Sequence, residues 1–289
     1  MTKLPLFIAA AIILYGCTSD SVGASNNNDV ITVISREDGS GTRMAFSELF
    51  GLHQRNNDGT ISDLTAEYSA VTNSAAVMMA SVAGNPNAIG YLSLGTPCSL
   101  VKTVSIDNVS STVENIKNGS YRFCRPFIAV TLGEQSEAVK DFLSFITSEQ
   151  GCSIAEKNSF VGINDSEYIK NFSKGEITVS GSSSVVLLMQ KFKDAYKIIN
   201  PDVKITVQQS DSSSGIAAVL DGVSDIGMIS RPPTENELEK GIMPTTIAID
   251  GIAVIINRSN NIDNLTSEQI RKIYSGETTC WREITAENQ

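Results

Sequence analysis

Short runs of apolar residues recur along the chain, and most are followed by a segment whose apolar residues lie three or four positions apart. The first pattern predicts strands and the second predicts helices. Strands are expected at residues 30–35, 88–94, 127–131, 177–179, 203–207, 225–229 and 247–256, the last interrupted at Asp250-Gly251. Helices are expected at residues 44–50, 73–83, 137–150, 185–199, 216–220 and 268–274. This alternation predicts an α/β fold with largely parallel sheets.

Three turns rich in serine and glycine each leave an expected strand and open an expected helix. They span residues 35–43, 181–184 and 211–215. Ligands of α/β proteins bind at the carboxyl ends of strands. A helix N-terminus there offers unpaired N–H groups and a partial positive charge. The three turns together therefore predict a site for a small oxyanion, although each alone is also explained by ordinary helix capping.

The turns carry the side chains that such a site needs. Hydroxyl groups and nearby amides are expected to donate to the anion from Ser40, Gly41, Thr42, Ser183, Ser184 and Ser212. Arg36 is expected to add a charge-assisted, bidentate contact. Asp38 follows two residues later and is expected to orient that guanidinium.

The N-terminus has a uniformly apolar pattern. Lys3 precedes an apolar run at residues 4–14, which is too short to span a bilayer comfortably and is typical of an export signal. Tyr15-Gly16-Cys17 then resembles the lipobox of bacterial lipoproteins, with Tyr15 bulkier than usual. We expect a signal peptide at 1–16, lipidation of Cys17 and a polar tether at 17–28. A buried first helix is the alternative, but the run is not amphipathic.

The composition is that of a soluble globular protein, with 41% hydrophobic and 19% charged residues. A chain of 289 residues forms one large domain or two of ordinary size. The formal net charge of −10 at pH 7 argues against a nucleic-acid partner, because such a partner requires a basic surface.

Motifs of the common catalytic sites are missing from the sequence. It has no Gly-x-Ser-x-Gly elbow, no Walker A loop and no Ser-x-x-Lys after the first or third turn. The single histidine, His53, lies in a polar stretch rich in asparagine, which leaves little for a zinc site or a serine nucleophile. The sequence therefore predicts no catalytic residue, no metal and no cofactor.

Four cysteines follow Cys17, at positions 98, 124, 152 and 280. In an exported protein this even number permits two disulfides in any of three pairings. Isolated buried thiols are the alternative, because buried cysteine is common.

Several segments resemble the phosphate-binding lipoproteins of the bacterial Pst-type ABC transporter. They are residues 35–42, 87–91, 125–127, 177–184, 212–216, 225–231 and 250–254, within nearly everything after the tether. The resemblance implies a two-lobed class II periplasmic-binding-protein fold, with a hinge between the lobes and the ligand in the interlobe cleft. It further implies high-affinity binding of inorganic phosphate by an exported, lipid-anchored monomer that delivers phosphate to ABC permease subunits.

The resemblance also assigns the site to two lobes. It implies that one lobe binds phosphate through Ser183, Ser184, Ser212 and Ser230, and the other through Arg36, Ser40, Gly41 and Thr42. Some members of the family accept the proton of phosphate with an aspartate where this chain has Arg231. Asp38, Asp211 and Asp250 are the alternative acceptors, with Asp38 favoured, and without one of them discrimination against sulfate is in doubt.

The order of the segments departs from the family pattern, in which the Gly181-Ser184 turn comes first and the Arg36 segment later. The halves are exchanged, as in a circular permutation, or the chain is a piece of a tandem or misassembled gene. With this order, one lobe is formed by residues 29–119 plus 255–289 and the other by 120–254. Alternative functions are binding of another small oxyanion, a sensor or adhesin role and, less favoured, hydrolysis of a phosphate ester.

Overall fold

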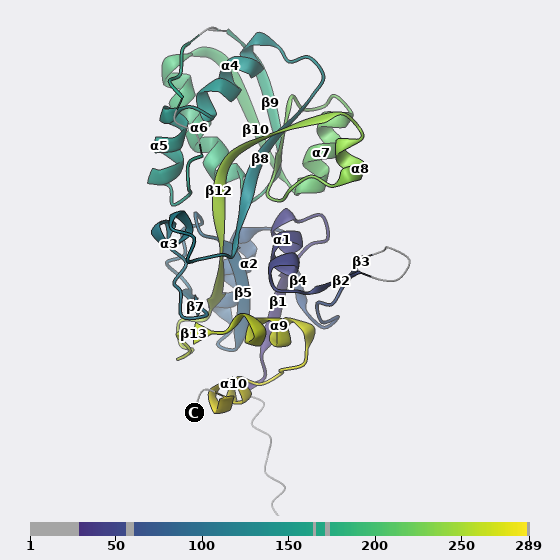
Figure 1. Cartoon of the computed structure of the whole chain (residues 1–289), viewed down its shortest axis with the longest axis vertical. Coiled ribbons are helices and arrows are strands. Elements are labelled where there is room, and N and C mark those ends of the chain that lie inside the picture. The colour runs from purple at the N-terminus through teal and green to yellow at the C-terminus, as the bar shows by residue number, and fades with distance from the viewer. Residues whose placement is uncertain (1–28, 56–60, 164–165, 171–173, 288–289) are drawn as a thin grey trace, which may run out of the picture.

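The computed structural model of the chain describes residues 29–55, 61–163, 166–170 and 174–287 (Figure 1). The expected signal peptide, Cys17 and the tether lie outside the described residues. Among the residues that are described, no helix has the length and apolar character needed to cross a membrane.

One mixed sheet runs through the described part of the molecule, with the strand order β10-β9-β11-β8-β12-β5-β1-β4 and with β6 paired to β12. Its strands are β1 (Thr32–Arg36), β4 (Ala70–Thr72), β5 (Ala88–Ser93), β6 (Lys102–Thr103), β8 (Cys124–Leu132), β9 (Lys174–Ser182), β10 (Asp202–Ser210), β11 (Ile226–Ile229) and β12 (Ile242–Ile256). Two small ribbons pair β2 (His53–Arg55) with β3 (Ile61–Asp63), and β7 (Ser105–Ile106) with β13 (Asn264–Leu265).

The two central strands, β8 and β12, are antiparallel to each other and to the strands beside them, β11 and β5. On one side, β9 runs parallel to β10 and β11, and on the other side β1 runs parallel to β4 and β5. The expected parallel arrangement therefore holds on both sides of β8 and β12 but not at the centre. β12 pairs with β8 up to Gly251 and with β5 from Ile252. The expected interruption at Asp250-Gly251 is wrong, since β12 continues through it. A Cβ atom at Gly251 would lie 2.7 Å from Ile116 Cδ1, so the glycine marks close packing and not a break.

The helices are α1 (Gly41–Leu49), α2 (Ala75–Gly84), α3 (Val113–Lys117), α4 (Glu137–Ile146), α5 (Glu149–Lys157), α6 (Val186–Ile199), α7 (Ser212–Leu220), α8 (Glu235–Leu238), α9 (Ser267–Ser275) and α10 (Trp281–Glu287). The single helix expected at 137–150 is wrong, because α4 ends at Ile146 and Ser148 caps a new helix, α5. Gly151 lies against the carbonyl of Ile146, where any side chain would clash, and so permits this tight corner.

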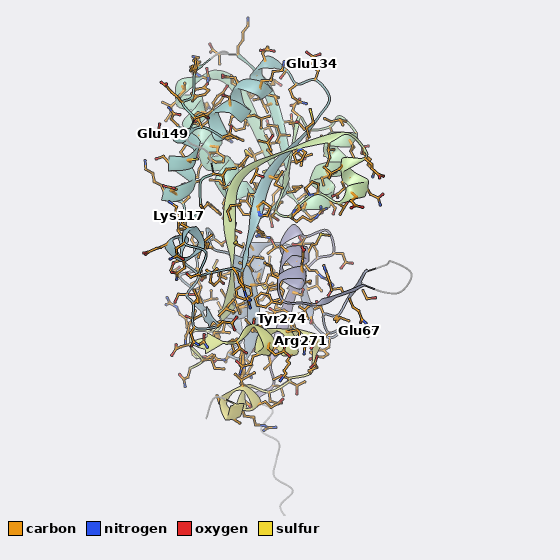
Figure 2. The ribbon with its side chains drawn as sticks, in the orientation of Figure 1. Glu67, Lys117, Glu134, Glu149, Arg271 and Tyr274 are labelled. Atoms are coloured by element: carbon orange, nitrogen blue, oxygen red, sulfur yellow. The ribbon has the colours of Figure 1, made fainter. Side chains whose placement is uncertain are left out.

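Two hydrophobic cores lie on either side of the point where β8 and β12 cross the middle of the molecule (Figure 1). The lower half, residues 29–123 and 252–287, has a core in which Phe46 stacks on Tyr91 with ring centroids 4.0 Å apart. Tyr274, on α9, lies in the same core and is labelled in the lower half of the molecule (Figure 2). In the upper half, residues 124–251, α4 packs on β9 and α6 packs on β10, around Phe142 and Tyr196.

The two ends of the described chain lie together at the base of the lower half (Figure 1). Val30 forms an antiparallel bridge with Cys280, and Ile31 N donates to Thr279 O at 2.8 Å. The cysteines at positions 98, 124, 152 and 280 are all partly buried and form no disulfide with one another among the described residues. The structure thus agrees with the alternative of separate thiols.

Candidate anion-binding site

The turn between β9 and α6 leaves a helix N-terminus without a side-chain cap. Gly181 has φ of +134° and its Cα faces the carbonyl of Met228, a position where a side chain would clash. Val185 is the N-cap of α6, and no side chain of the described residues caps it. Within the preceding turn, Ser184 N donates to Ser182 Oγ at 3.3 Å. By contrast, Ser40 caps α1 and Asp211 caps α7. Helix capping therefore explains some of the residues in the first and third turns but not those in the turn at 181–184. The N-terminus of α6, which carries a partial positive charge, is suited to an anion.

Three buried serines from the upper half form a cluster beside this turn. Ser182 ends β9, Ser212 begins α7 and Ser230 follows β11, and each is 3% exposed or less. Ser182 Oγ donates to Ser230 Oγ at 2.9 Å, and Ser230 N donates to Ser212 Oγ at 3.2 Å. Their hydroxyl groups are buried and lie close to one another.

The first turn of α1, in the lower half, packs directly on this cluster. A Cβ atom at Gly41 would clash with Ser212 Oγ and would lie 2.7 Å from Ser230 Oγ, so glycine is required for the two halves to meet here. Thr42 Oγ1 and Ser184 Oγ share a hydrogen bond of 2.8 Å. The site is therefore formed by segments from both halves of the molecule, each half with its own hydrophobic core.

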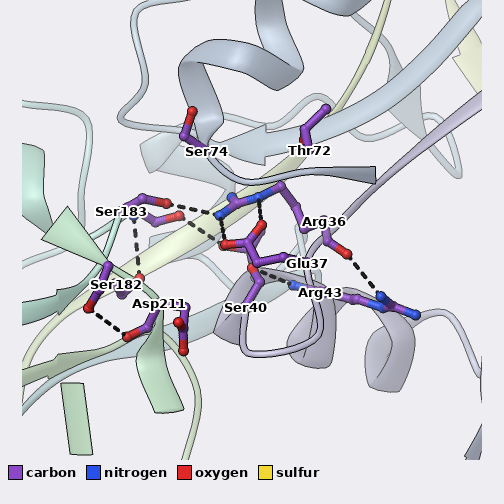
Figure 3. Close-up of polar contacts among 12 residues, drawn as sticks. Arg36, Glu37, Ser40, Arg43, Thr72, Ser74, Ser182, Ser183 and Asp211 are labelled. Atoms are coloured by element: carbon purple, nitrogen blue, oxygen red, sulfur yellow. Dashed lines mark hydrogen bonds and ion pairs between the residues drawn. The ribbon is translucent and has the colours of Figure 1, made fainter. Parts of the chain in front are cut away.

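Arg36 completes the contact between the halves. Its side chain is 2% exposed, and Nη2 donates to Ser183 Oγ at 3.0 Å (Figure 3). The structure thus brings together all the residues expected to bind the anion: Arg36, Ser40, Gly41, Thr42, Ser183, Ser184, Ser212 and Ser230.

Glu37, and not Asp38, orients the guanidinium of Arg36. Glu37 accepts hydrogen bonds from Arg36 Nε at 2.8 Å and from Nη2 at 2.7 Å. The expectation for Asp38 is wrong, because its side chain is 96% exposed and accepts a hydrogen bond from Arg43 Nη1 at 2.6 Å. Two acidic residues stand side by side in the sequence, and only the fold decides which one faces inward.

Tyr91, on β5, is hydrogen-bonded to the backbone of Arg36. Its hydroxyl oxygen accepts from Arg36 N at 3.2 Å and lies 3.0 Å from Ser35 Oγ. Burial raises the pKa of Tyr91 to about 12, so the hydroxyl stays protonated and is able to donate to Ser35. Sequence reasoning missed this residue, whose one signal was a tyrosine within an otherwise apolar strand.

A buried ion pair lies between the central strands, next to the serine cluster. Arg125 Nη2 donates to Asp250 Oδ2 at 3.0 Å, and Arg125 Nη1 lies 3.4 Å from the carbonyl oxygen of Ser230. Asp250 Oδ1 accepts from Ser93 Oγ at 2.8 Å. Burial raises the pKa of Asp250 to about 6, although Arg125 opposes the shift. Asp250 thus joins the two halves, and both of its oxygens already accept hydrogen bonds. Arg125 was not singled out from the sequence as a site residue.

Arg231 is neutralised by a carboxylate close to it in the sequence. Its Nη1 and Nη2 donate to the two oxygens of Glu237, both at 2.7 Å. Burial raises the pKa of Glu237, but hydrogen bonds from Arg231 and from Thr234 N outweigh it and leave the pKa lowered. Arg231 is therefore ion-paired with Glu237, as Arg36 is with Glu37.

Comparison with known proteins shows the family of the chain. The model of the PBP superfamily domain matches residues 20–150 and 166–289. The chain is 44% identical to phosphate-binding protein PstS 2 of Streptococcus agalactiae serotype V, over 94% of this chain and 93% of that protein. It is 38% identical to phosphate-binding protein PstS 2 of Streptococcus pneumoniae serotype 4, over 94% of each chain.

A solved structure agrees with these sequence matches. The crystal structure of a phosphate-binding protein of a phosphate ABC transporter from Streptococcus pneumoniae TIGR4 superposes with a TM-score of 0.68 and 39% identity, and covers 88% of this chain and 99% of that chain. The two-lobed α/β architecture is thus that of a periplasmic binding protein. The chain belongs to the PBP superfamily and, within it, to the family of PstS phosphate-binding proteins.

Proposed function

We propose that this chain binds inorganic phosphate outside the cytoplasm, with high affinity, and delivers it to an ABC-type permease. The observation that carries the proposal is the meeting of Arg36 with the uncapped N-terminus of α6 among buried hydroxyl groups. Charge-assisted and neutral donors directed at one place are suited to a tetrahedral oxyanion. The ligand contacts come from Arg36, Ser40, Gly41, Thr42, Ser183, Ser184, Ser212 and Ser230.

The two lobes close on the ligand by hinge motion. In this proposal the lobes are residues 29–119 with 255–289, and residues 120–254. Two separate hydrophobic cores support a two-lobed arrangement, and β8 and β12 are the strands that pass between them. The cores move the boundary slightly, because Tyr121, Phe123, Ile252 and Val254 pack in the core of the lower half. Lys117 on α3 adds a further link across the boundary, since Nζ donates to Glu156 Oε1 on α5 at 2.6 Å (Figure 2).

Asp211 is better placed than Asp38 to accept the proton that phosphate carries at neutral pH. Its carboxylate lies directly against Gly39, so closely that a Cβ atom there would clash with Oδ1. Burial raises the pKa of Asp211, but hydrogen bonds from the hydroxyl and N–H of Ser214 outweigh it, so the pKa is lowered and the group stays ionised. An ionised acceptor at the lobe contact favours hydrogen phosphate over sulfate, which has no proton to donate.

We infer that the chain acts as a binding protein and not as an enzyme, because the relatives that align with nearly its whole length are named phosphate-binding proteins. Among the described residues, no group of three or more histidine, cysteine or acidic side chains could hold a metal ion. His53 lies on β2, in a small ribbon apart from the main sheet. Binding of another small oxyanion remains the first alternative, with a sensor or adhesin role as the second.

The protein works as a monomer that is attached to the cell envelope through a lipid on Cys17. We propose that its segment order is a circular permutation of the family pattern given above. The closeness of Val30 and Cys280 supports this, because ends that lie together are easily joined and reopened elsewhere. The single alignment with the Streptococcus agalactiae protein runs over 94% of this chain, so that relative shares the order.

Calorimetric titration tests the proposal. The chain from residue 18 onward is stripped of bound anion and titrated with phosphate, sulfate and a small carboxylate. Phosphate is expected to bind at least a hundredfold more tightly than sulfate. Heat with sulfate or the carboxylate, but none with phosphate, would refute the assignment of the ligand.

A further inference from the structure

Arg43 joins the end of β1 to the first turn of α1, which are the two parts of the anion-binding site in the lower half. Its Nη1 donates to the carbonyl oxygen of Arg36 at 3.0 Å, although the two residues are seven positions apart. Arg43 itself stands in the first turn of α1, directly after Gly41 and Thr42. One side chain therefore crosses the turn at 35–43 and connects both anion-binding parts (Figure 3).

The backbone of Arg36 is thus held by side chains at both its N–H and its carbonyl group. Tyr91 accepts from the N–H at 3.2 Å, and Arg43 donates to the carbonyl oxygen. Glu37 accepts from the guanidinium. The position of the Arg36 side chain at the lobe contact therefore depends on Arg43 as well as on the groups that touch the guanidinium.

Asp63, on β3, orients the guanidinium of Arg43 in turn. Its Oδ2 accepts from Arg43 Nε at 3.0 Å, and its Oδ1 accepts from the N–H of Thr65 at 2.9 Å and from the hydroxyl of Thr65 at 2.6 Å. Burial raises the pKa of Asp63, but hydrogen bonds from Thr65 and attraction to Arg43 outweigh it, so the pKa is lowered and the carboxylate stays charged. The small ribbon of β2 and β3 thereby contacts the site through Arg43.

Local helix preferences do not explain an arginine at this position. The N-terminus of a helix carries a partial positive charge, so a cation is unfavourable there and acidic residues are preferred. The first turn of α1 contains no acidic residue, and Ser40 caps it. The side chain of the arginine contacts Arg36, Asp38 and Asp63, which all lie outside α1. These contacts explain the arginine where helix stability does not.

We propose that Arg43 is a positioning residue for phosphate binding and acts through Arg36. It fixes the end of β1 relative to α1, so that the guanidinium of Arg36 is already in place when the lobes close on the ligand. Donors that are fixed in advance lose less conformational entropy on binding and therefore bind more tightly. This inference rests on the proposed function and deepens it, because the ligand and the binding residues are the same.

A double-mutant cycle tests the inference, with phosphate titrated calorimetrically into the full chain after bound anion has been removed. Arg43→Met should weaken phosphate binding about tenfold in the otherwise unchanged chain, as for the loss of one charge-assisted hydrogen bond. In the Arg36→Ala background the same replacement should change the affinity less than about twofold, because the group that Arg43 positions is gone. A role in stability alone would not produce this difference.

Two further variants separate position from charge. Arg43→Lys keeps the charge, but an ammonium group is a compact point charge without the separate donors that reach Arg36 and Asp63. It should therefore weaken phosphate binding nearly as much as Arg43→Met. Asp63→Asn leaves one oxygen where two accept hydrogen bonds, and should weaken binding about threefold. Combined with Arg43→Met, it should add no further loss.

Arg271→Met is the matched control. Arg271 also forms ion pairs with two carboxylates, Glu268 at 2.8 Å and Glu277 at 2.6 Å, and its side chain is 27% exposed against 20% for Arg43. It lies on α9 and is labelled well below the lobe contact (Figure 2). Its replacement should lower the free energy of unfolding, measured in urea, about as much as Arg43→Met does, and should leave phosphate affinity unchanged.

The outcomes separate the two proposals. Unchanged phosphate affinity in Arg43→Met, full affinity in Arg43→Lys, or an equal loss with and without Arg36→Ala would overturn the positioning role and leave the proposed function intact. A loss that disappears in the Arg36→Ala background supports the role. If the unaltered chain binds no phosphate, the proposed function is wrong and this inference fails with it.

Discussion

Arg36 and Ser183 are 147 positions apart in the chain, and a hydrogen bond of 3.0 Å from Nη2 to Oγ joins them. Each belongs to a segment that packs on a different hydrophobic core. The bond is therefore a direct contact between the two lobes and depends on their relative position.

Replacement of Arg36 by alanine should weaken phosphate binding at least tenfold, which corresponds to ~1.4 kcal/mol or more. A buried guanidinium that donates charge-assisted hydrogen bonds is worth about 1.5–3 kcal/mol per bond. Calorimetric titration measures the change, and Arg282→Ala is the control because that side chain is 64% exposed on α10. An unchanged affinity in Arg36→Ala would remove this residue from the site.

Replacement of Asp211 by asparagine should lower the preference for phosphate over sulfate about tenfold, mainly through weaker phosphate binding. Asparagine caps helices as well as aspartate does, so α7 keeps its N-cap and the fold is retained. Competition titrations of both anions measure the ratio. Asp38→Asn is the matched control and should leave the ratio unchanged. If instead Asp38→Asn lowers it and Asp211→Asn does not, the proton acceptor is Asp38.

Replacement of Tyr91 by phenylalanine should lower the free energy of unfolding by about 1–3 kcal/mol, because the N–H of Arg36 and the hydroxyl of Ser35 lose a buried partner. Phosphate affinity should fall as well, since the backbone of Arg36 is less firmly held. Urea unfolding and calorimetry give the two values. Tyr68→Phe, at a side chain 61% exposed, should change neither. Full stability in Tyr91→Phe would contradict the role of its hydroxyl.

The buried carboxyl of Asp250 should make stability depend on pH. Its pKa is about 6 in the folded protein against 3.8 for an unperturbed aspartate, so the folded state binds its proton more tightly than the unfolded state. The stabilising contribution is present below about pH 4 and is lost as pH rises to about 6. The size is about 3 kcal/mol, from 1.36 kcal/mol per pKa unit.

Urea unfolding between pH 4 and pH 7 measures this effect as the stability difference between wild type and Asp250→Asn. The difference should decrease from pH 4 to pH 6 and level off above that. The unpaired Arg125 of the variant adds an offset at every pH and does not create the trend. A difference that is constant over this range, or that increases with pH, would show that the carboxyl is not buried as described.

Much of the site was predictable because its polar side chains lie in turns where strands end and helices begin. Ser183, Ser212 and Arg36 each stand in a short turn whose glycines and hydroxyl groups are visible in the sequence. Tyr91 was not predictable, because its role depends on contacts with Ser35 and Arg36, 56 and 55 positions away. The pairing of Arg125 with Asp250 spans 125 positions and was hidden for the same reason.

The errors have local physical causes. Asp38 and Glu37 are adjacent and chemically alike, and the direction of one turn decides which carboxylate reaches Arg36. The break between α4 and α5 depends on how Gly151 approaches the carbonyl of Ile146, and no pattern of apolar residues reports such a contact. In both cases the tertiary arrangement overrides a reasonable reading of local sequence.

The two strands that connect the lobes, β8 and β12, form one paired ribbon and are not two independent linkers. β8 and β12 are hydrogen-bonded to each other along the upper lobe, and the ladder continues through Ile252 N, which donates to Phe123 O at 2.8 Å. Sliding one lobe past the other would break several of these bonds at once, whereas bending or twisting the ribbon keeps them. Bending and twisting are therefore the relative motions that the ribbon permits, and under the proposed hinge closure they would bring Arg36 back to the same serines.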